Sequence, residues 1–315
     1  MKARPGDGAA ETLPRATAVA EPLAAGAFEG LDLLRCARRV GYVFAGGSVR
    51  CAFQIGVVEA LAELGVRPAL TVGASAGAWN AAMVSARIIH RMRYYWKTFV
   101  RMPRFDLRNL LVDHSPWRFR RMHKRVFDKF IGRDRFRQPD ALPLFVSVTR
   151  IRDRENVIFG AHEVDDPLEL LLATNYLVPY YTHPPEINGS CYCDGGVSDN
   201  APYEKAFAEG CDAVVLVALK GDSEGQLFKS ARDREHVIPP EFASRMVVVR
   251  PRHRLPISFT ENRWSVLGPL ADVGYLRTRE VLLAERHPET DLCAKGEAPS
   301  AKIERVVNVV RRVFA

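Results

Sequence analysis

The chain has 315 residues, of which 47% are hydrophobic and 26% are charged, as in a soluble globular protein with one large α/β domain or two smaller ones. No apolar run approaches the roughly 18 residues that a membrane-spanning helix needs, so we expect no such helix. The formal net charge is +8, and it is concentrated in residues 87–137.

The start of the chain reads as a tail. Its first thirty residues contain prolines and acidic residues, which interrupt the apolar core that a signal peptide requires. We therefore predict that residues 1–37 are a disordered tail and that residues 38–315 form the folded domain. Without an export signal, we expect a cytoplasmic protein whose six cysteines are reduced. Cys191 and Cys193 form one close pair, and no second pair stands at ligand spacing, so neither a metal site nor a cofactor is expected.

From residue 40 the chain reads as alternating strands and helices. Val40–Phe44 predicts a first strand, and a glycine-rich loop at 45–50 follows it. Residues 51–64 carry apolar side chains at helical spacing, and Gly65 is placed to end that helix. A second strand follows Pro68. Two successive strand–loop–helix units imply parallel strands with covering helices.

The second unit contains Gly73-Ala74-Ser75-Ala76-Gly77, which has the Gly-x-Ser-x-Gly form of a nucleophile elbow. In such an elbow a strand ends, the backbone turns sharply at a serine, and a helix begins at once. Gly73 and Gly77 suit a turn too tight for larger side chains, and the helix expected over 76–89 presents unpaired N–H groups near the serine. We interpret Ser75 as a nucleophile. An ordinary turn serine is the alternative, because so short a motif also arises by chance.

The later elements are predicted from local patterns alone. Strands are expected at 144–149, 157–159, 214–219 and 246–249, and helices at 117–131, 166–174, 267–283 and 302–313.

An acyl-transferring serine also needs a base and preorganised donors for the oxyanion. The loop 46–50 can supply donors, because consecutive small residues let backbone N–H groups point at a ligand. Neither nucleotide-binding fingerprint fits this loop, which disfavours a phosphate-binding role. The best candidate base is Asp194, which ends an apolar run and precedes Gly195 and Gly196. A plain turn aspartate is the alternative.

Taken together, these three segments resemble the patatin-like phospholipases. Gly46-Gly47-Ser48-Val49-Arg50, Gly73-Ala74-Ser75-Ala76-Gly77 and Asp194-Gly195-Gly196 match that family's signatures in order. The resemblance covers about residues 38–220. It implies a three-layer α/β/α sandwich around a mostly parallel central sheet, which agrees with the alternating strands and helices.

The resemblance also implies a Ser–Asp dyad without a histidine, acting on esters of phospholipids or related lipids. In that dyad Ser75 attacks the ester carbonyl and Asp194 takes the proton, without a cofactor. The oxyanion hole would be formed at Gly46, Gly47, Ser48 and Arg50, and the glycines that support the two motifs would be Gly73, Gly77, Gly195 and Gly196.

The glycine loop departs from the family at two positions. Ser48 stands in place of the family's third glycine, and Cys51 replaces the glycine after the arginine. Losing one oxyanion donor costs about 10²–10³ in rate, so a weak or inactive lipid-binding homologue is one alternative. The other is an α/β-hydrolase with a Ser–Asp–His triad. Its histidine would follow the acid in the chain, and by order His236, His253 and His287 qualify.

Residues 87–137 hold thirteen Arg and three Lys against four Asp, a net charge of +12, and the rest of the chain carries −4. The segment also contains ten aromatic residues, and arginine mixed with Trp and Tyr suits a surface that meets a membrane. We expect a basic helical insertion that caps the acyl pocket and contacts an anionic membrane peripherally. A solvated helical face with its aromatics in the core is the alternative. No nucleic-acid-binding motif accompanies the charge, so nucleic acid is not an expected partner, and the sequence gives no oligomeric state.

Overall fold

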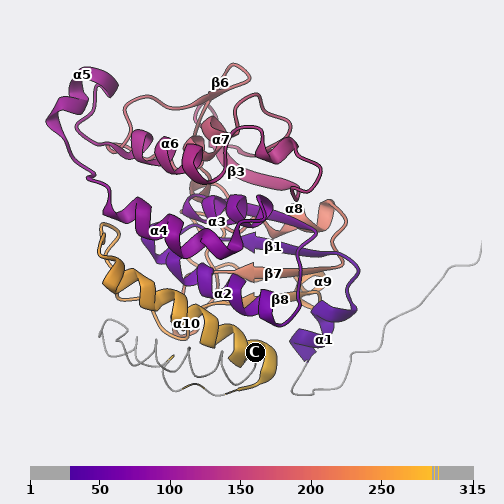
Figure 1. Ribbon diagram of the computed structural model, residues 1–315. Helices are drawn as coiled ribbons and strands as arrows, with labels where there is room; N and C mark the ends of the chain where they lie inside the picture. The colour runs from indigo at the N-terminus through magenta and orange to yellow at the C-terminus, as the bar shows by residue number, and fades with distance from the viewer. Residues whose placement is uncertain (1–28, 286, 288–289, 291–315) are drawn as a thin grey trace, which may run out of the picture.

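The computed structural model describes residues 29–285, 287 and 290, which Figure 1 draws in colour. The helix expected at 302–313 and the expected tail up to residue 28 lie outside this range. The end of that tail was predicted wrongly, because Glu29–Cys36 forms helix α1. Leu31 and Leu34, three positions apart on one face of α1, are buried in the main core. Burial of this apolar face stabilises a helix that the composition of the tail did not indicate.

Eight strands form a single mixed sheet. They are β1 (Val40–Phe44), β2 (Leu70–Ala74), β3 (Leu144–Arg150), β4 (Asn156–Gly160), β5 (Glu186–Ile187), β6 (Ser190–Asp194), β7 (Ala213–Val217) and β8 (Met246–Val249). Their order is β5-β6-β3-β2-β1-β7-β8, with β4 paired to β3 off this path. The five central strands from β3 to β8 run parallel, and β4, β5 and β6 pair antiparallel. The predicted mostly parallel sheet is confirmed.

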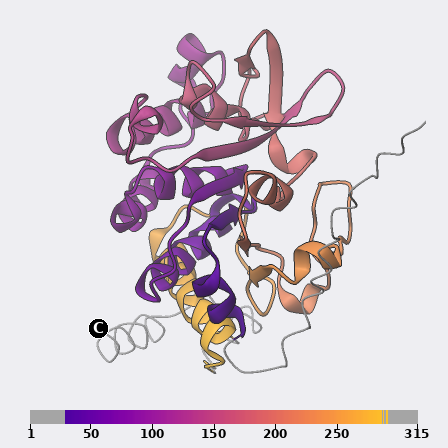
Figure 2. The same ribbon diagram turned by 90° about the vertical axis from the view of Figure 1, so that its right-hand side faces the viewer.

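Helices lie on both faces of this sheet, as Figures 1 and 2 show from two directions. Beyond α1 they are α2 (Ala52–Glu63), α3 (Ala76–Ser85), α4 (Met92–Arg101), α5 (Leu110–Asp113), α6 (Phe119–Phe130), α7 (Pro167–Ala173), α8 (Tyr203–Ala208), α9 (Pro240–Ala243) and α10 (Trp264–Leu283). A short 3₁₀ helix, Ser48–Cys51, precedes α2. The elements alternate as the sequence predicted, and α4, α5, α8 and α9 are additions to the predicted set.

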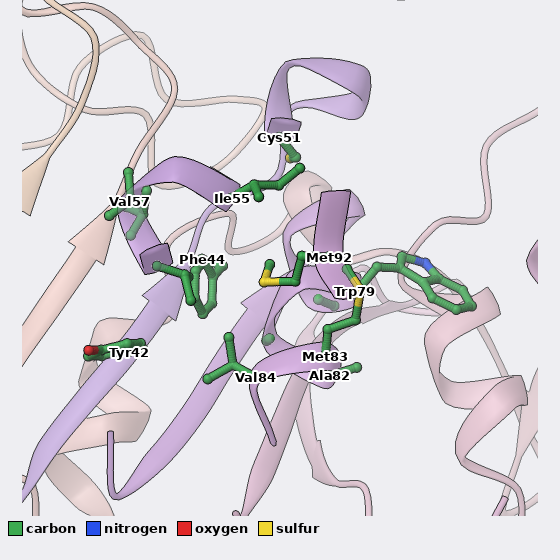
Figure 3. Close-up of a cluster of buried hydrophobic side chains, with 14 of the residues drawn as sticks. Tyr42, Phe44, Cys51, Ile55, Val57, Trp79, Ala82, Met83, Val84 and Met92 are labelled. Carbon is green, nitrogen blue, oxygen red and sulfur yellow. The ribbon is translucent and has the colours of Figure 1, made fainter. Parts of the chain in front are cut away.

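Successive side chains of β1 point to opposite faces of the sheet, and each face covers its own hydrophobic core. Tyr42 and Phe44 enter the larger core with α2, α3 and α10, and Val43 enters the smaller core with α8 on the other face. Figure 3 draws Phe44 in the larger core together with Met92 and with Val84 of α3. The three layers of the predicted sandwich are therefore present, and one helical layer is much thicker than the other.

The helix after the serine is shorter than predicted, because α3 ends at Ser85. The Ser85 hydroxyl donates a hydrogen bond to the Leu142 carbonyl, and the Ser85 carbonyl accepts the Leu142 N–H. Arg87 then takes a positive φ of 60°, which an α-helix does not allow. The chain restarts as α4, the first long helix of the basic insertion.

Within the described residues, no helix combines the length and apolar character needed to cross a membrane. The same part of the chain holds no group of three or more His, Cys, Asp or Glu side chains placed to bind a metal ion. Its five cysteines are free thiols, and the sixth, Cys293, lies outside the described range.

Candidate functional site

Ser75 stands at the sharp turn between β2 and α3. Its φ of 51° and ψ of −137° are a strained combination for a residue with a side chain. A Cβ on Gly77 would lie 2.4 Å from the Phe44 carbonyl oxygen, and one on Gly73 would lie 2.5 Å from the Ala78 Cα. Both glycines fit this turn because they lack side chains, and together they hold the serine at the end of the strand.

Asp194 reaches Ser75 through the register of the sheet. Ala74, the residue before the serine, lies opposite Ser147 of β3, and Asp194 of β6 lies opposite Val148, the next residue of β3. The Ser75 hydroxyl donates a hydrogen bond of 2.6 Å to Asp194 Oδ2. Two residues far apart in the chain thus meet at one point on the sheet.

The Asp194 carboxyl group is held in a nearly closed environment, and only 5% of the residue is exposed. Its Oδ1 accepts the Gly196 N–H at 2.7 Å. Burial disfavours the charged form and raises the pKa of Asp194 to about 6, against the lowering effect of its hydrogen bonds from Ser75 and Gly196. Gly195 lets the chain pass at close range, because a Cβ there would lie 2.1 Å from the Ser147 carbonyl oxygen. The carboxylate is therefore a stronger base than an exposed aspartate.

Two residues at the end of α7 fix the backbone of the serine. The Ser75 N–H donates to the Thr174 hydroxyl at 2.8 Å, and that hydroxyl donates to the Ser147 carbonyl at 2.6 Å. The Asn175 side-chain amide donates to the Ser75 carbonyl and to the Leu171 carbonyl, both at 3.1 Å. The strained turn is thus supported on both its amide and its carbonyl side.

The glycine loop lies directly over the serine, since a Cβ on Gly46 would be 2.5 Å from the Ser75 Cβ. Asn200 bonds Gly46 twice: its Oδ1 accepts the Gly46 N–H at 2.9 Å, and its Nδ2 donates to the Gly46 carbonyl at 3.2 Å. Because the Gly46 N–H is already bonded, the prediction that Gly46 donates to an oxyanion is wrong. Gly46 instead ties the loop to the segment that follows Asp194.

Ser48 keeps a glycine-like backbone. Its φ of 56° lies in the left-handed region that glycine favours, and its hydroxyl donates to the Phe259 carbonyl at 3.2 Å. In the described part of the chain, no hydrogen bond from the Ser48 N–H is found, and the residue lines the pocket with Ser75. This N–H is therefore an unoccupied donor in a residue that borders the pocket.

Cys51 lies beneath the loop, fully buried. Its thiol donates to the Ala45 carbonyl, with a sulfur–oxygen distance of 3.8 Å. Burial raises the pKa of the Cys51 thiol above its usual range, so the sulfur stays neutral. Arg50 is not among the residues that line the pocket, and its buried Nε has no hydrogen-bond partner among the described residues. At the position where the family has a glycine, the Cys51 thiol therefore bonds the backbone at the start of the loop.

A pocket with a cavity volume of about 90 Å³ opens above Ser75 and Asp194. Its walls are mostly aromatic: Trp79, Tyr95, Trp96, Phe99, Phe119, Tyr180, Tyr181 and Phe259. Figure 3 shows Trp79 extending from α3 on the side away from Phe44 and Val84. An aromatic lining of this kind fits an apolar ligand.

The basic insertion supplies one side of this pocket through α4 and α6. Of its ten aromatic residues, six are buried: Tyr95, Trp96, Phe99, Phe127, Phe130 and Phe136. These six residues therefore do not contribute to the outer surface of the segment. They form the core and the pocket wall, which is the alternative that the sequence left open.

His123 of α6 is a pocket residue that the sequence analysis missed. Its ring stacks on Trp79 with centroids 4.7 Å apart, and its Nδ1 lies 2.9 Å from both the Tyr181 hydroxyl and the Phe119 carbonyl. Burial lowers the pKa of His123 to about 4, so the ring is neutral at physiological pH. The sequence could have indicated that His123 is buried, because it follows Phe119 by one helical turn on the apolar face of a predicted helix.

The three histidines of the triad alternative lie elsewhere. His236 Nε2 bonds the Tyr203 hydroxyl at 2.7 Å, and His287 Nε2 lies 3.1 Å from a carboxylate oxygen of Glu285. His253 is not part of the pocket lining. In the described part of the chain, no histidine hydrogen-bonds to Ser75 or Asp194.

The geometry agrees with a comparison at the sequence level. The model of the family described as patatin-like phospholipase matches residues 42–207, more than half of the chain. The matched span contains the glycine loop, the serine turn and Asp194. The chain belongs to the patatin-like phospholipase family.

Among its relatives, the chain is 28% identical to human 1-acylglycerol-3-phosphate O-acyltransferase PNPLA3 over 51% of this chain and 34% of that one. It is 26% identical to an uncharacterized NTE family protein of Mycobacterium tuberculosis over 66% of this chain and 56% of that one. The matches therefore span between about a third and just over half of the relatives' length. Among solved structures, VipD from Legionella pneumophila aligns with a TM-score of 0.48 and 14% identity, covering 87% of this chain and 75% of that one.

Proposed function

We propose that this patatin-like phospholipase hydrolyses carboxylic esters of lipids, with Ser75 as nucleophile and Asp194 as general base. The observation that carries the proposal is the 2.6 Å hydrogen bond from the Ser75 hydroxyl to Asp194 Oδ2, at the floor of an aromatic pocket. A serine hydroxyl becomes a good nucleophile when an adjacent base takes its proton. The apolar walls favour an acyl chain as the bound group.

In the proposed mechanism, the Ser75 oxygen attacks the ester carbonyl carbon as its proton passes to Asp194. The negative charge on the former carbonyl oxygen is then stabilised by backbone N–H groups of the glycine loop, first of all that of Ser48. Arg50 adds a fixed positive charge beneath the loop. Protonated Asp194 returns its proton to the leaving alcohol, and water attacks the acyl-enzyme with Asp194 again as base.

Labelling by a fluorophosphonate probe tests the role of Ser75. We expect the full-length protein to form a covalent adduct on Ser75, detected by mass spectrometry of the peptide, and the Ser75→Ala variant to form none. Ser85, which is buried and bonded to Leu142, serves as the matched control, because Ser85→Ala should leave labelling intact. A folded protein that binds lipid but is not labelled would support the inactive lipid-binding homologue instead.

The pH dependence tests the role of Asp194. Its carboxylate must be ionised to accept the serine proton, and its pKa is raised to about 6. Activity should therefore be complete above this pH and should be lost as the pH falls through it, with kcat/KM falling about tenfold for each further unit. The measurement is kcat/KM on an uncharged ester between pH 4.5 and 8, with folding monitored by circular dichroism. Activity that is constant down to pH 4.5 would contradict Asp194 as the base.

A further inference from the structure

A loop of the basic insertion projects from the molecule and exposes apolar side chains. Arg104–Asp106 and Pro116–Arg118 run antiparallel, joined by backbone hydrogen bonds of 2.9 Å, and hold residues 107–115 between them. Figure 1 shows α5, in this loop, standing away from the body of the molecule. The buried Asn109 side chain donates to the carbonyls of Ser115 and Trp117, so the loop has a defined internal structure. We name residues 105–112 the apolar tip.

The apolar side chains of the apolar tip face solvent. Phe105, Leu107, Leu110, Leu111 and Val112 are between 44% and 87% exposed, with Leu111 the most exposed. These five account for nearly half of the eleven large hydrophobic residues that are exposed in the described part of the chain. Such a concentration within eight residues is unusual for a surface that contacts only water, and it indicates a binding surface.

Positive charge surrounds the apolar tip. Residues 101–129 contain nine Arg and Lys against three Asp. At the base of the apolar tip, a surface groove lies between the end of α4 and α6. It is lined by one acidic side chain, Asp128, and by five cationic ones: Arg118, Arg121, Lys124, Arg125 and Lys129. Lys124 pairs with Asp128, whereas Arg125 has no ion pair with any described residue. The groove therefore presents uncompensated positive charge next to exposed apolar side chains.

The apolar tip is also continuous with the mouth of the acyl pocket. Phe105 packs against Trp117 at 5.4 Å between ring centroids, Trp117 against Tyr180 at 5.3 Å, and Tyr180 against Phe259 at 6.1 Å. Tyr180 and the exposed Phe259 line the pocket. An aromatic path thus leads from the tip to the site of Ser75.

We propose that the apolar tip and the basic groove dock this protein on the surface of an anionic lipid bilayer, with the tip inserted and the pocket mouth facing the lipid. The inference rests on the proposed function to explain why the protein would bind a membrane, but the binding itself does not require catalysis. A bilayer fits both halves of the surface, because its acyl region takes Leu111 and Val112 and its anionic head groups meet the cations beside them. A lipid ester drawn from that surface would enter a pocket that the docked face already borders.

Co-sedimentation with lipid vesicles tests the docking surface. The full-length Ser75→Ala protein is used, so that the vesicles stay intact, with phosphatidylcholine vesicles with and without phosphatidylglycerol. Leu111→Asp is expected to lower the partition constant about tenfold, and Arg125→Gln with Lys129→Gln about 25-fold on the anionic vesicles. High salt should weaken binding to the anionic vesicles. Val237→Asp and Arg152→Gln, two exposed positions elsewhere, are the matched controls and should change little.

Several results would overturn the proposal. Binding that ignores phosphatidylglycerol and salt, or equal losses in the tip variants and in the controls, would exclude this surface as the membrane contact. A dimer in sedimentation velocity that Leu111→Asp dissociates would assign the tip to self-association. Hydrolysis of a water-soluble ester separates the docking proposal from the proposed function. The docking substitutions are made in the protein that keeps Ser75, and these variants should retain that activity. If the unmodified protein does not hydrolyse the soluble ester, the proposed function is contradicted. The vesicle-binding result would still test the docking proposal.

Discussion

Asparagine at position 194 is expected to lower kcat by about 10⁴-fold and to make the folded protein more stable at neutral pH. The loss of activity follows because an amide cannot accept the Ser75 proton, and replacing a comparable buried carboxylate in a serine protease costs about this much. The geometry should survive the change. In the Asp194→Asn variant the side-chain amide oxygen can accept the Gly196 N–H as Asp194 Oδ1 does, and the NH₂ group can donate to the Ser75 oxygen.

The stability gain follows from the raised pKa of Asp194. In the unfolded chain the carboxyl ionises near its ordinary value of about 4, and in the folded protein near 6. The folded state therefore binds the proton more tightly, and stability is lost as the pH rises from about 4 to about 6. Asparagine removes this cost, which is about 2–3 kcal/mol for a shift of about two units. The difference should be complete above pH 6 and should disappear near pH 4.

Thermal unfolding at pH 7 and pH 4.5, beside kcat on a soluble ester, measures both effects. A rise in Tm of about 5 °C at pH 7 and a small one at pH 4.5 are expected. Asp199→Asn is the matched control, because burial also raises the pKa of Asp199 to about 6, yet Asp199 bonds the Ala201 N–H and not Ser75. It should keep most of the activity. If Asp194→Asn were active and a substitution at His236, His253 or His287 were not, the dyad would be excluded.

Alanine at position 56 is expected to destabilise the fold by about 3 kcal/mol or more, which is at the upper end for an overpacked core. Gly56 lies where α2 crosses α10, and a Cβ there would be 1.6 Å from the Ala271 carbonyl oxygen. Gly274 of α10 faces α2 in return, with a Cβ position 2.0 Å from the Phe53 carbonyl oxygen. Backbone meets backbone on both sides, so no side-chain rotation can make room, and the helices must move apart.

Urea unfolding of Gly56→Ala measures this cost. Gly30→Ala is the matched control in a helix that also packs in the main core, because its Cβ would meet the Leu282 side chain at an ordinary 3.4 Å. That control should be neutral or slightly stabilising, since alanine favours a helix over glycine by about 1 kcal/mol. A Gly56→Ala protein that unfolds at the same urea concentration as the unchanged protein would mean that the helix crossing tolerates a wider separation.

Much of the fold could be predicted because its elements depend on local patterns. Buried strands such as Val40–Phe44 and Ala213–Val217 are continuous apolar runs, and Gly65 marks the end of α2. The candidate site required more. The pairing of Ser75 with Asp194 depends on strand register across β3, which no local pattern encodes. Local pattern made Asp194 a candidate base, and the family resemblance paired it with Ser75.

The residues that support the site could not be predicted in this way. Thr174 and Asn175 reach Ser75 from a helix end about one hundred positions away, and nothing in their own neighbourhood indicates this contact. Gly46 looked like a donor because glycines permit one, but the Asn200 side chain occupies its N–H. The run from Leu107 to Val112 was overlooked for a different reason. Only burial separates an apolar residue in the core from one at the surface, and the sequence does not give the burial of these residues.

The pocket draws its parts from two regions of the chain that differ in kind. Ser48, Ser75 and Asp194 stand at the ends of strands in the sheet, whereas Tyr95, Phe99 and other wall residues belong to the insertion between α3 and β3. Under the proposed function, the reacting groups and the residues that would contact the acyl chain therefore belong to separate segments of the chain. Exchanging the insertion for a longer or shorter one is a route to a new acyl preference that leaves the reacting groups in place. Because the insertion also carries the proposed docking surface, the same exchange would change how the protein binds a membrane under that proposal.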